Sequence, residues 1–246
     1  MNERIALIGG SGLSRLDALE VEHRQIVVTP YGEPSAPLTF GRFDGLPIVF
    51  LPRHGEAHTI PPHLVNYRAN LWALHSVGIR QVVSVASVGG ITRSPATLCV
   101  PDQIIDYTWG REHTYVDCPC TSVKHVDFTQ PYCEELRRHL LRAGASAGLA
   151  VEDGGTYGAT QGPRLESAAE IRRLERDGCD LVGMTGMPEA ALARELDLCF
   201  AHLCLVVNWA AGKAEGPISM ERIREVLETS IDSVRRIISR LSPEES

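Results

Sequence analysis

Short apolar runs that open directly into turns of small residues constrain this chain more than any other feature. The run 5–8 leads into a glycine-rich segment, 9–12, and the run 81–86 leads into another, 87–90. A third run, 198–207, is apolar almost throughout. Such runs, bounded by turn residues, indicate buried strands, and α/β folds place ligands in the turns that follow strand ends. The sequence therefore predicts an α/β fold with a site at its strand ends.

The stretch 160–189 holds two further turns of this type. The segment 162–164, Gly-Pro-Arg, is a rigid turn that is soon followed by the carboxylate of Glu166. A helix-like run and an apolar strand come next, and the second turn, 183–189, follows that strand. Because both turns follow strands, we expect them to form opposite walls of one pocket.

The composition of the 246 residues limits the classes of partner. Hydrophobic residues make up 43% and charged residues 22%, which is typical of a globular protein, and we expect a single domain spanning 1–246. The net charge of −7 argues against binding to nucleic acid but leaves room for a small anionic substrate. No apolar window is long enough for a membrane span, and the N-terminal residues lack a signal-peptide pattern. We therefore expect no membrane partner and a cytoplasmic location.

The seven cysteines fit the same location. An odd number of cysteines without a signal peptide indicates a reducing compartment. Cys118 and Cys120, separated by one proline, are either loop thiols or a strained redox pair. Cys199 and Cys204 lie in the apolar run and are expected to be buried core thiols.

Periodicity and turn residues predict the remaining elements. We expect antiparallel strands within 23–51, further strands at 100–107 and 152–160, and helices at 62–76, 131–147 and 219–241. The segment 107–131 is long, polar and irregular, and such loops are often functional or contact a neighbouring subunit.

Several strand-end turns carry groups suited to binding an anion. Ser11 offers a hydroxyl donor among glycines whose backbone N–H groups can approach a ligand, although a tight turn alone would look the same. Arg53 and His54 follow a strand, and a guanidinium presents a planar fork of donors that matches phosphate oxygens. If Ser87 and Thr185 converge on the same place, the site would suit a free phosphate.

Other readings of these motifs are weaker. A dinucleotide-binding fingerprint fails because Arg15 stands at its third glycine position. His54 and His58 have the spacing of helical metal ligands, but the prolines at 61–62 break a helix and no third ligand is evident, so we expect no metal. Asn208 follows the third apolar run, and its amide, both donor and acceptor, suits the edge of a heterocycle.

The chain resembles a known family through six motifs that occur in one order: IGGSGL, PRHG, VNYRANLWAL, GPRLES, GMTGMPE and VVNW. They are similar to those of the trimeric purine nucleoside phosphorylases, closest to the methylthioadenosine phosphorylase branch, over nearly the whole chain. The resemblance implies one nucleoside phosphorylase domain, with a mixed, partly barrel-like sheet flanked by helices, in a homotrimer with its active site near a subunit interface. It also implies a pentosyltransferase that uses inorganic phosphate as co-substrate and needs no metal or organic cofactor.

The resemblance also assigns roles to individual residues. Those that would hold phosphate are Ser11, Arg53, His54, Ser87 and Thr185. Those that would contact the nucleoside are Ala86, Gly89, His125, Leu165, Glu166, Met184, Asn208, Met220 and Ile223. Asn208 and His54 are the expected catalytic residues. Ala86 replaces a Thr common in the methylthioadenosine branch, so one hydrogen bond to phosphate or ribose would be missing or come from water.

Two positions predict which purine binds. Methylthioadenosine phosphorylases of this family usually place Asp at the positions of Asn208 and Ala210, whereas 6-oxopurine-specific phosphorylases place Asn at the first and Glu at that of Glu166. A carboxylate accepts the N1–H of hypoxanthine or guanine, and an amide can donate to O6, while the bare N1 of adenine would repel the carboxylate. We therefore expect a 6-oxopurine, unless Glu166 is only a solvated carboxylate at a helix start.

The segment before the last helix predicts the sugar. Nucleoside phosphorylases that bind a 5′-hydroxyl often carry a His there, but 217–223 has none, and Met220 and Ile223 would form an apolar pocket. His125 would close this pocket from an adjacent subunit. The expected reaction is phosphorolysis of S-methyl-5′-thioinosine to hypoxanthine and 5-methylthioribose 1-phosphate. The alternatives are methylthioadenosine phosphorylase, inosine/guanosine phosphorylase and a non-catalytic purine-binding protein.

Overall fold

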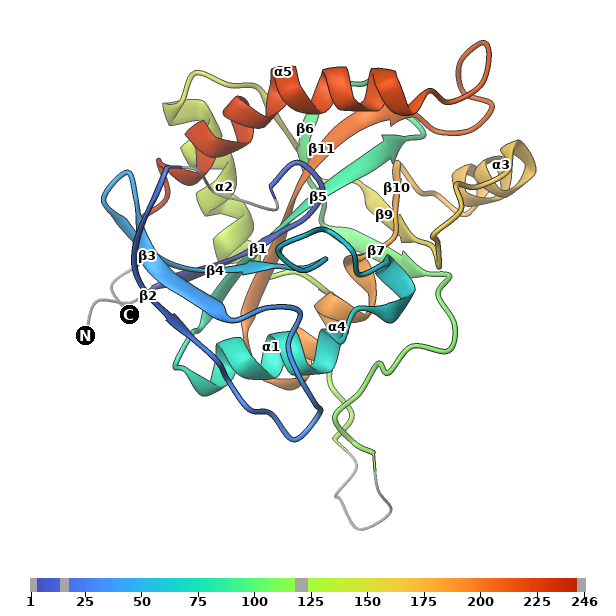
Figure 1. Cartoon of the computed structure of the whole chain (residues 1–246). Coiled ribbons are helices and arrows are strands. Elements are labelled where there is room, and N and C mark those ends of the chain that lie inside the picture. Colours follow the sequence, from blue (N-terminus) through green and yellow to red (C-terminus); the bar gives the residue numbers. More distant parts are fainter. Residues whose placement is uncertain (1–3, 14–17, 118–123, 243–246) are drawn as a thin grey trace.

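The computed structural model describes residues 4–13, 18–117 and 124–242 of the chain. Eleven strands in this described part form one mixed sheet, which is flanked by helices (Figure 1). The strands are β1 (Ile5–Gly9), β2 (Leu19–Gln25), β3 (Leu38–Phe43), β4 (Leu46–Pro52), β5 (Gln81–Gly90), β6 (Leu98–Val100), β7 (Gln103–Asp106), β8 (Val151–Asp153), β9 (Thr156–Ala159), β10 (Leu181–Gly183) and β11 (Cys199–Trp209). The helices are η1 (Pro62–Leu64), α1 (Tyr67–Ser76), α2 (Glu134–Ser146), α3 (Ala168–Arg176), α4 (Gly186–Glu195) and α5 (Met220–Ile238).

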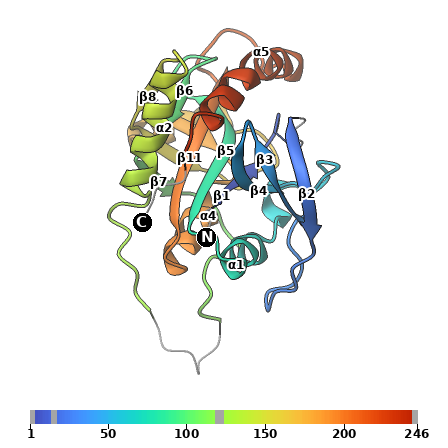
Figure 2. The ribbon, with the colours of Figure 1, turned by 90° about the vertical axis from the view of Figure 1, so that its left-hand side faces the viewer.

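Helices cover both faces of the central strands β1, β5 and β11 (Figures 1 and 2). Successive side chains of a strand point to opposite faces. Ile8 and Val82 accordingly join a core cluster with residues of α1 and α4, whereas Leu7 and Val83 join a second cluster with residues of α2 and α5. The predicted α/β class, with a mixed central sheet flanked by helices, is confirmed.

Strand β5 is the branch point of the sheet. On one edge, β1 pairs in parallel with residues 81–84, and β10 pairs antiparallel with residues 89–90. On the other edge, β11 follows β5 in parallel almost from end to end. Residues 85–88 therefore lie beside a gap between the end of β1 and β10. In α/β sheets, ligands bind in crevices of this kind, beyond the carboxyl ends of neighbouring strands.

The turn after β1 needs glycine because other segments approach it closely. A Cβ on Gly9 would lie 2.1 Å from the carbonyl oxygen of Leu13. A Cβ on Gly10 would lie 2.8 Å from both Arg53 Nη1 and the carbonyl oxygen of Val85. The glycine-rich turn predicted from the sequence is thus a tight junction between the ends of β1, β4 and β5.

Most of the expected elements are present with shifted boundaries. The three expected helices correspond to α1, which follows η1, and to α2 and α5, and the segment 107–131 is irregular wherever it is described. The strand expected at 100–107 is instead two strands, β6 and β7, because Pro101 has no N–H for the ladder. The strand expected at 152–160 is also two strands, β8 and β9, separated by Gly154 and Gly155, which both have positive φ. No helix in the described part of the chain is both long and apolar enough to cross a bilayer.

Two of the expected turns are wrong. The segment 87–90 is the end of β5, because Gly89 and Gly90 still pair with β10 and β11. The segment 183–189 is only partly a turn, since α4 begins at Gly186 with Thr185 as its N-cap. As a result Glu189, at the end of that motif, lies inside the protein.

The expectation for the cysteines is partly wrong. Cys204 is a buried free thiol, as predicted, but Cys199 forms a disulfide with Cys133. Cys133 immediately precedes α2, and its N–H donates to the carbonyl of Phe200 next to Cys199, so backbone pairing brings the two sulfurs together. The predictions for Cys118 and Cys120 fall outside the described residues.

Candidate functional site

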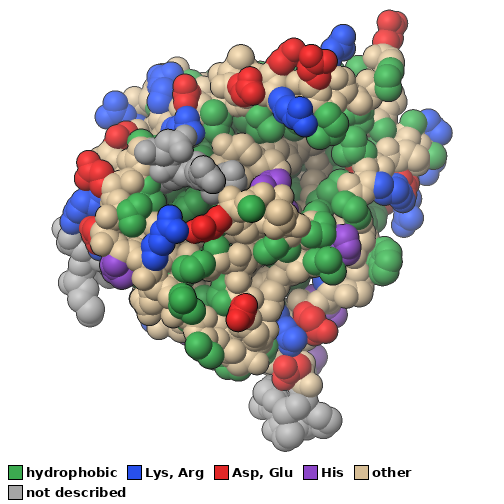
Figure 3. Space-filling model, viewed as in Figure 1, with side chains coloured by type: hydrophobic (Ala, Val, Ile, Leu, Met, Phe, Trp, Pro, Cys, Tyr) green, Lys and Arg blue, Asp and Glu red, His purple; other side chains and the backbone are tan. Residues whose placement is uncertain are grey.

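A cavity of about 630 Å³ opens at the gap between β1 and β10. Figure 3 shows this face of the molecule hollowed near its centre, with hydrophobic side chains bordering the hollow. Both turns of the stretch 160–189 line the cavity, as the sequence predicted. The predicted site residues that line it are Ser11, Arg53, His54, Ser87, Thr185, Ala86, Gly89, Leu165, Glu166, Met184, Asn208, Met220 and Ile223.

His125 is the predicted site residue that the fold leaves outside this cavity. Its side chain is exposed, on the irregular segment before α2. The expected contribution of His125 to the cavity of a neighbouring subunit stays a prediction.

Arg53, at the end of β4, is held by a carboxylate that the sequence did not reveal. Its Nε donates to Glu189 Oε1 at 2.5 Å, and its Nη2 donates to Glu189 Oε2 at 3.2 Å. Nη2 also donates to Ser84 Oγ at 2.5 Å, and Nη1 donates to the carbonyl of Val85 at 3.2 Å. The open guanidinium fork expected from the sequence is therefore largely occupied. One Nη1 hydrogen lacks a partner among the described residues and stays available to a ligand.

The Arg53–Glu189 pair is fully buried and ionised. The two side chains are 1% and 0% exposed. Burial by itself raises the pKa of Glu189, but the charge of Arg53 and the hydrogen bonds to the carboxylate outweigh it and hold this pKa at about 2. His202 Nε2 lies 3.7 Å from Glu189 Oε2, and burial lowers the pKa of His202, so this ring is neutral near pH 7. Glu189, the last residue of the motif 183–189, therefore fixes the orientation of the Arg53 guanidinium.

His54 presents an acceptor to a ligand. Its Nδ1 lies 2.8 Å from the carbonyl oxygen of Ile60, and since a carbonyl can only accept, Nδ1 carries the hydrogen. Burial and the nearby charge of Arg53 lower the pKa of His54 to about 4. The ring is therefore neutral near pH 7, and Nε2 carries a lone pair rather than a hydrogen.

Hydrogen bonds join the turns that surround the gap in the sheet. Ser87 Oγ donates to the carbonyl of Ser11 at 2.9 Å, which ties β5 to the turn after β1. Ser11 Oγ lies 3.4 Å from Nε2 of His58, which the sequence suggested only as a metal ligand and which also lines the cavity. Thr185 immediately precedes α4, whose backbone leaves the helical conformation at Met187, so its hydroxyl rather than a helix dipole is what it offers a ligand.

Glu166 and Asn208 meet in the cavity from separate elements. Thr160 donates its hydroxyl hydrogen to Glu166 Oε1 at 2.6 Å, and Oε2 has no protein partner among the described residues. Asn208 lies beside a bulge of β11, and its Nδ2 donates to the carbonyl of Trp209 at 2.7 Å. One amide hydrogen and the amide oxygen of Asn208 remain for a ligand. Together they offer a heterocycle one carboxylate acceptor and one amide.

The first turns of α5 supply the apolar part of the cavity. Met220 and Ile223, both predicted, line it together with Leu227. Ser219 caps this helix by accepting from the N–H of Arg222, which fixes where the helix begins. Met220 is 57% exposed, so it lies at the open rim. Arg224, which the sequence analysis did not select, also lines the cavity.

Arg111 is a further residue that sequence reasoning missed. Its guanidinium lies within hydrogen-bond distance of the carbonyl oxygens of Thr160, Gln161, Met184 and Met187. It also donates to the Gln161 side chain and to Tyr67 Oη. These contacts bind the two walls of the cavity to each other, although Arg111 belongs to the irregular segment 107–131. The length of that segment was the one available signal.

Comparison with known proteins identifies the family. A family model described as "Phosphorylase superfamily" matches residues 4–242. A protein of Pseudomonas syringae pv. tomato, named "Probable S-methyl-5'-thioinosine phosphorylase", is 50% identical over 96% of this chain and 97% of its own length. A Dictyoglomus turgidum protein, named "Probable 6-oxopurine nucleoside phosphorylase", is 42% identical over 98% of this chain and 91% of its own.

Solved structures of similar fold are also nucleoside phosphorylases. The methylthioadenosine phosphorylase from Schistosoma mansoni in complex with adenine matches with a TM-score of 0.92 and 30% identity, covering 97% of this chain and 90% of that one. A methylthioadenosine phosphorylase from an antarctic soil metagenomic library matches with a TM-score of 0.89 and 36% identity, covering 97% and 85%. The chain belongs to the phosphorylase superfamily.

Proposed function

We propose that the protein cleaves S-methyl-5′-thioinosine with inorganic phosphate, releasing hypoxanthine and 5-methylthioribose 1-phosphate. The observation that carries this proposal is the meeting of Glu166 and Asn208 in one cavity with the apolar side chains of Met220 and Ile223. The names of the relatives support both halves of the substrate, since some are called thioinosine phosphorylases and others 6-oxopurine nucleoside phosphorylases.

The base is selected by the free groups of Glu166 and Asn208. The free Oε2 of Glu166 suits the N1–H of hypoxanthine, and the free amide hydrogen of Asn208 suits O6 or N7. Adenine has no hydrogen on N1, so the carboxylate would face a lone pair. Sites built around such a hydrogen bond discriminate strongly against analogues that cannot form it.

The sugar is selected by the side chains of α5. Met220, Ile223 and Leu227 form an apolar lining that accommodates a 5′-methylthio group, and the methionine sulfur suits an irregular apolar contact. A 5′-hydroxyl would find no histidine among 217–223 to bond with. Inosine is therefore the weaker substrate.

The reaction follows from the charges that develop. The C1′–N9 bond breaks with oxocarbenium character on the sugar, and phosphate held beside it captures the cation. Ser11, Thr185 and the free Nη1 hydrogen of Arg53 are the donors for phosphate. Ser87 donates to phosphate only if its hydroxyl hydrogen leaves the carbonyl of Ser11. The purine leaves with negative charge, which the amide of Asn208 stabilises.

His54 has a distinct part in phosphate binding. Because its Nδ1 hydrogen is held by Ile60, its Nε2 accepts a hydrogen bond rather than donating one. Monohydrogen phosphate carries one P–O–H group that can donate to this nitrogen. His54 therefore orients the phosphate so that its unprotonated oxygens face the sugar.

One assay tests the proposed function. Purine release is measured from methylthioinosine, methylthioadenosine and inosine, each with and without phosphate and in the presence of a chelator. We expect phosphate-dependent release that is fastest from methylthioinosine and insensitive to the chelator, since no metal or organic cofactor is proposed. Equal release without phosphate would identify a hydrolase, and no release from any substrate would leave the non-catalytic alternative.

Changing the two base-contacting residues is expected to change the preferred purine. The double substitution Asn208→Asp with Glu166→Ser should raise the kcat/KM ratio of methylthioadenosine to methylthioinosine at least about tenfold, because the clash with N1 is removed and a carboxyl group can meet adenine. Each single variant serves as a control and should shift the ratio less. An unchanged ratio would show that other residues select the base.

We also infer a homotrimer from the likeness to trimeric phosphorylases. The cytoplasmic location stays a prediction, and the Cys133–Cys199 disulfide counts against it because disulfides are rare in reducing compartments. The exposed position of Met220 and Leu165 at the cavity, 57% and 42%, is consistent with closure by a neighbouring chain. Sedimentation analysis should give three times the mass of 26.9 kDa. A monomer with full activity would contradict this inference.

A further inference from the structure

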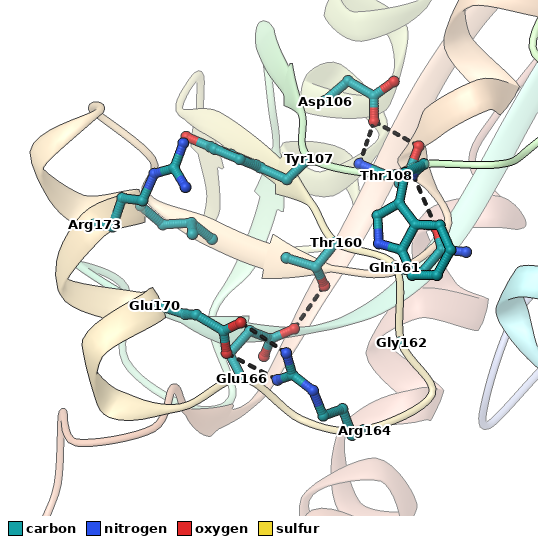
Figure 4. A pocket seen from close by; sticks show the side chains of 12 residues that line it. Asp106, Tyr107, Thr108, Thr160, Gln161, Gly162, Arg164, Glu166, Glu170 and Arg173 are labelled. Atoms are coloured by element: carbon teal, nitrogen blue, oxygen red, sulfur yellow. Dashed lines mark hydrogen bonds and ion pairs between the residues drawn. The ribbon is translucent and has the colours of Figure 1, made fainter.

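The wall that carries Glu166 separates two cavities. Glu166 lines the 630 Å³ cavity already described and also a second one of about 470 Å³ on the other side of the 160–166 segment. Figure 4 shows the residues that line this second cavity, among them Arg164 beside Glu170 and Arg173 beside Tyr107. A glutamate in this position has two directions open to its carboxylate. Its orientation must therefore be fixed before Oε2 can meet the base.

Thr160 provides that hold. Its hydroxyl has one hydrogen and two acceptors nearby, Glu166 Oε1 at 2.6 Å and the carbonyl of Gly183 at 3.3 Å. The shorter, charge-assisted contact takes the hydrogen. Thr160 is itself fixed, because its N–H donates to Gly183 and its carbonyl accepts from Arg111. As a β-branched residue it has few rotamers, so its hydroxyl is a rigid anchor.

The guanidinium of Arg164 makes its hydrogen bonds to a carboxylate other than that of Glu166. Arg164 donates from Nη1 and Nη2 to the two carboxylate oxygens of Glu170, at 2.8 and 2.7 Å. Glu170 is fixed in turn by the capping box of α3, in which it accepts from the N–H of Ser167. In Figure 4 Arg164 faces Glu170 while Glu166 faces Thr160. Glu166 is thus left with one anchored oxygen and one free oxygen.

We propose that Thr160 is the positioning residue for base selection: by binding Oε1 it holds Glu166 so that Oε2 meets the N1–H of a 6-oxopurine. This inference rests on the proposed function and deepens it. Thr160 lines the second cavity and not the first, so its hydroxyl binds one carboxylate oxygen from that side and leaves Oε2 for the base. Without this hydrogen bond, the carboxylate of Glu166 can rotate and lose its orientation. Thr160 itself does not touch the substrate, so its effect passes entirely through Glu166.

A double-mutant cycle tests this dependence. Thr160→Val keeps the shape of the side chain and removes the hydroxyl. It is expected to lower kcat/KM for methylthioinosine about tenfold while leaving that for methylthioadenosine unchanged, because a hydrogen bond to a charged group is lost. In the Glu166→Gln background the same substitution should change either rate less than about twofold. Thr160→Ser, which keeps the hydroxyl, should restore most of the selectivity.

Controls separate positioning from a general effect on folding. Thr156→Val alters the other end of β9, lines neither cavity, and should leave both rates unchanged. If Thr160→Val lowers both rates equally, or by the same factor in the Glu166→Gln background, the role is structural and the inference is wrong.

Binding of free bases keeps this test independent of catalysis. Calorimetry should show hypoxanthine binding weakened about tenfold by Thr160→Val, with adenine binding unaffected. A wild-type protein that binds hypoxanthine but does not turn over methylthioinosine would contradict the proposed function and leave the Thr160 result intact. Equal hypoxanthine binding by wild type and Thr160→Val would overturn the inference even in an active phosphorylase.

Discussion

Replacing Glu189 by alanine is expected to lower the free energy of unfolding by about 3–5 kcal/mol. Arg53 would remain as a buried cation whose described partners are Ser84 and the carbonyl of Val85. Because native domains are only marginally stable, a loss of this size removes a large part of their stability. Urea denaturation measures the change, and the KM for phosphate should rise in parallel because Arg53 loses its orientation.

Two other variants serve as controls for the loss of stability in Glu189→Ala. Glu189→Gln keeps the shape and part of the hydrogen bonding but not the charge, so its effect should be intermediate. Arg24→Ala removes an exposed ion pair with Glu56, whose side chains are 58% and 52% exposed, and should change the stability by less than about 1 kcal/mol. A Glu189→Ala protein as stable as the wild type would mean that water reaches Arg53 and replaces the carboxylate.

The same pair predicts how stability depends on pH. The pKa of Glu189 falls from an ordinary value of 4.5 to about 2 in the folded protein. A depressed folded pKa adds stability that is complete above pH 4.5 and is lost as the pH falls toward 2. The decline of the unfolding free energy over this range should therefore be smaller in Glu189→Gln than in the wild type. Parallel declines in the two proteins would contradict the ionised buried pair.

Replacing Arg111 by methionine is expected to separate the two walls of the cavity. The substitution removes this donor from four carbonyl oxygens, the buried one of Met187 and the partly buried ones of Thr160, Gln161 and Met184. Since an unsatisfied buried acceptor costs about 1–3 kcal/mol and water can reach the partly buried ones, we expect a loss of about 2–3 kcal/mol in unfolding free energy. The kcat/KM for methylthioinosine should fall about a hundredfold or more, because groups on both walls lose their alignment.

Conservative and surface variants serve as controls for Arg111. Arg111→Lys retains the charge but cannot reach both walls with one planar group, so it should recover stability better than activity. Arg173→Ala removes a 66% exposed arginine that lines the second cavity and should leave both quantities nearly unchanged. If Arg111→Met unfolds at the same denaturant concentration as wild type and keeps its activity, the two walls are joined by other contacts.

Local sequence patterns predicted the fold class and, with the family resemblance, most of the residues that line the cavity. The apolar runs at 5–8, 81–86 and 198–207 coincide with strands because burial on both faces demands apolar residues at successive positions. The motifs that follow the strands carry most of the residues that line the cavity, since the carboxyl ends of parallel strands meet at one edge of a sheet. Glu166 and Asn208 could be paired because their motifs resemble those of a family.

Elements with weaker local signals were misjudged for identifiable reasons. The small residues 87–90 predicted a turn. They continue β5 instead, because β10 and β11 supply partners for their backbone hydrogen bonds. Cys199 was predicted to be a core thiol because it lies in an apolar run. Its disulfide with Cys133 depends on where α2 packs against β11. Neither outcome is encoded within the segment itself.

The sequence by itself determined the long apolar strands, the motifs that follow them and the chemical character of the cavity. The tertiary structure alone decided which polar groups remain free for a ligand. Arg53 and Glu189 are 136 positions apart, and Arg111 and Met187 are 76 apart, so no local pattern could reveal that they meet. The physical reason is that the periodicity of apolar residues shows only that a segment is buried, whatever packs against it. A hydrogen bond forms only with one particular partner at the right distance and angle, and that partner is set by the tertiary structure.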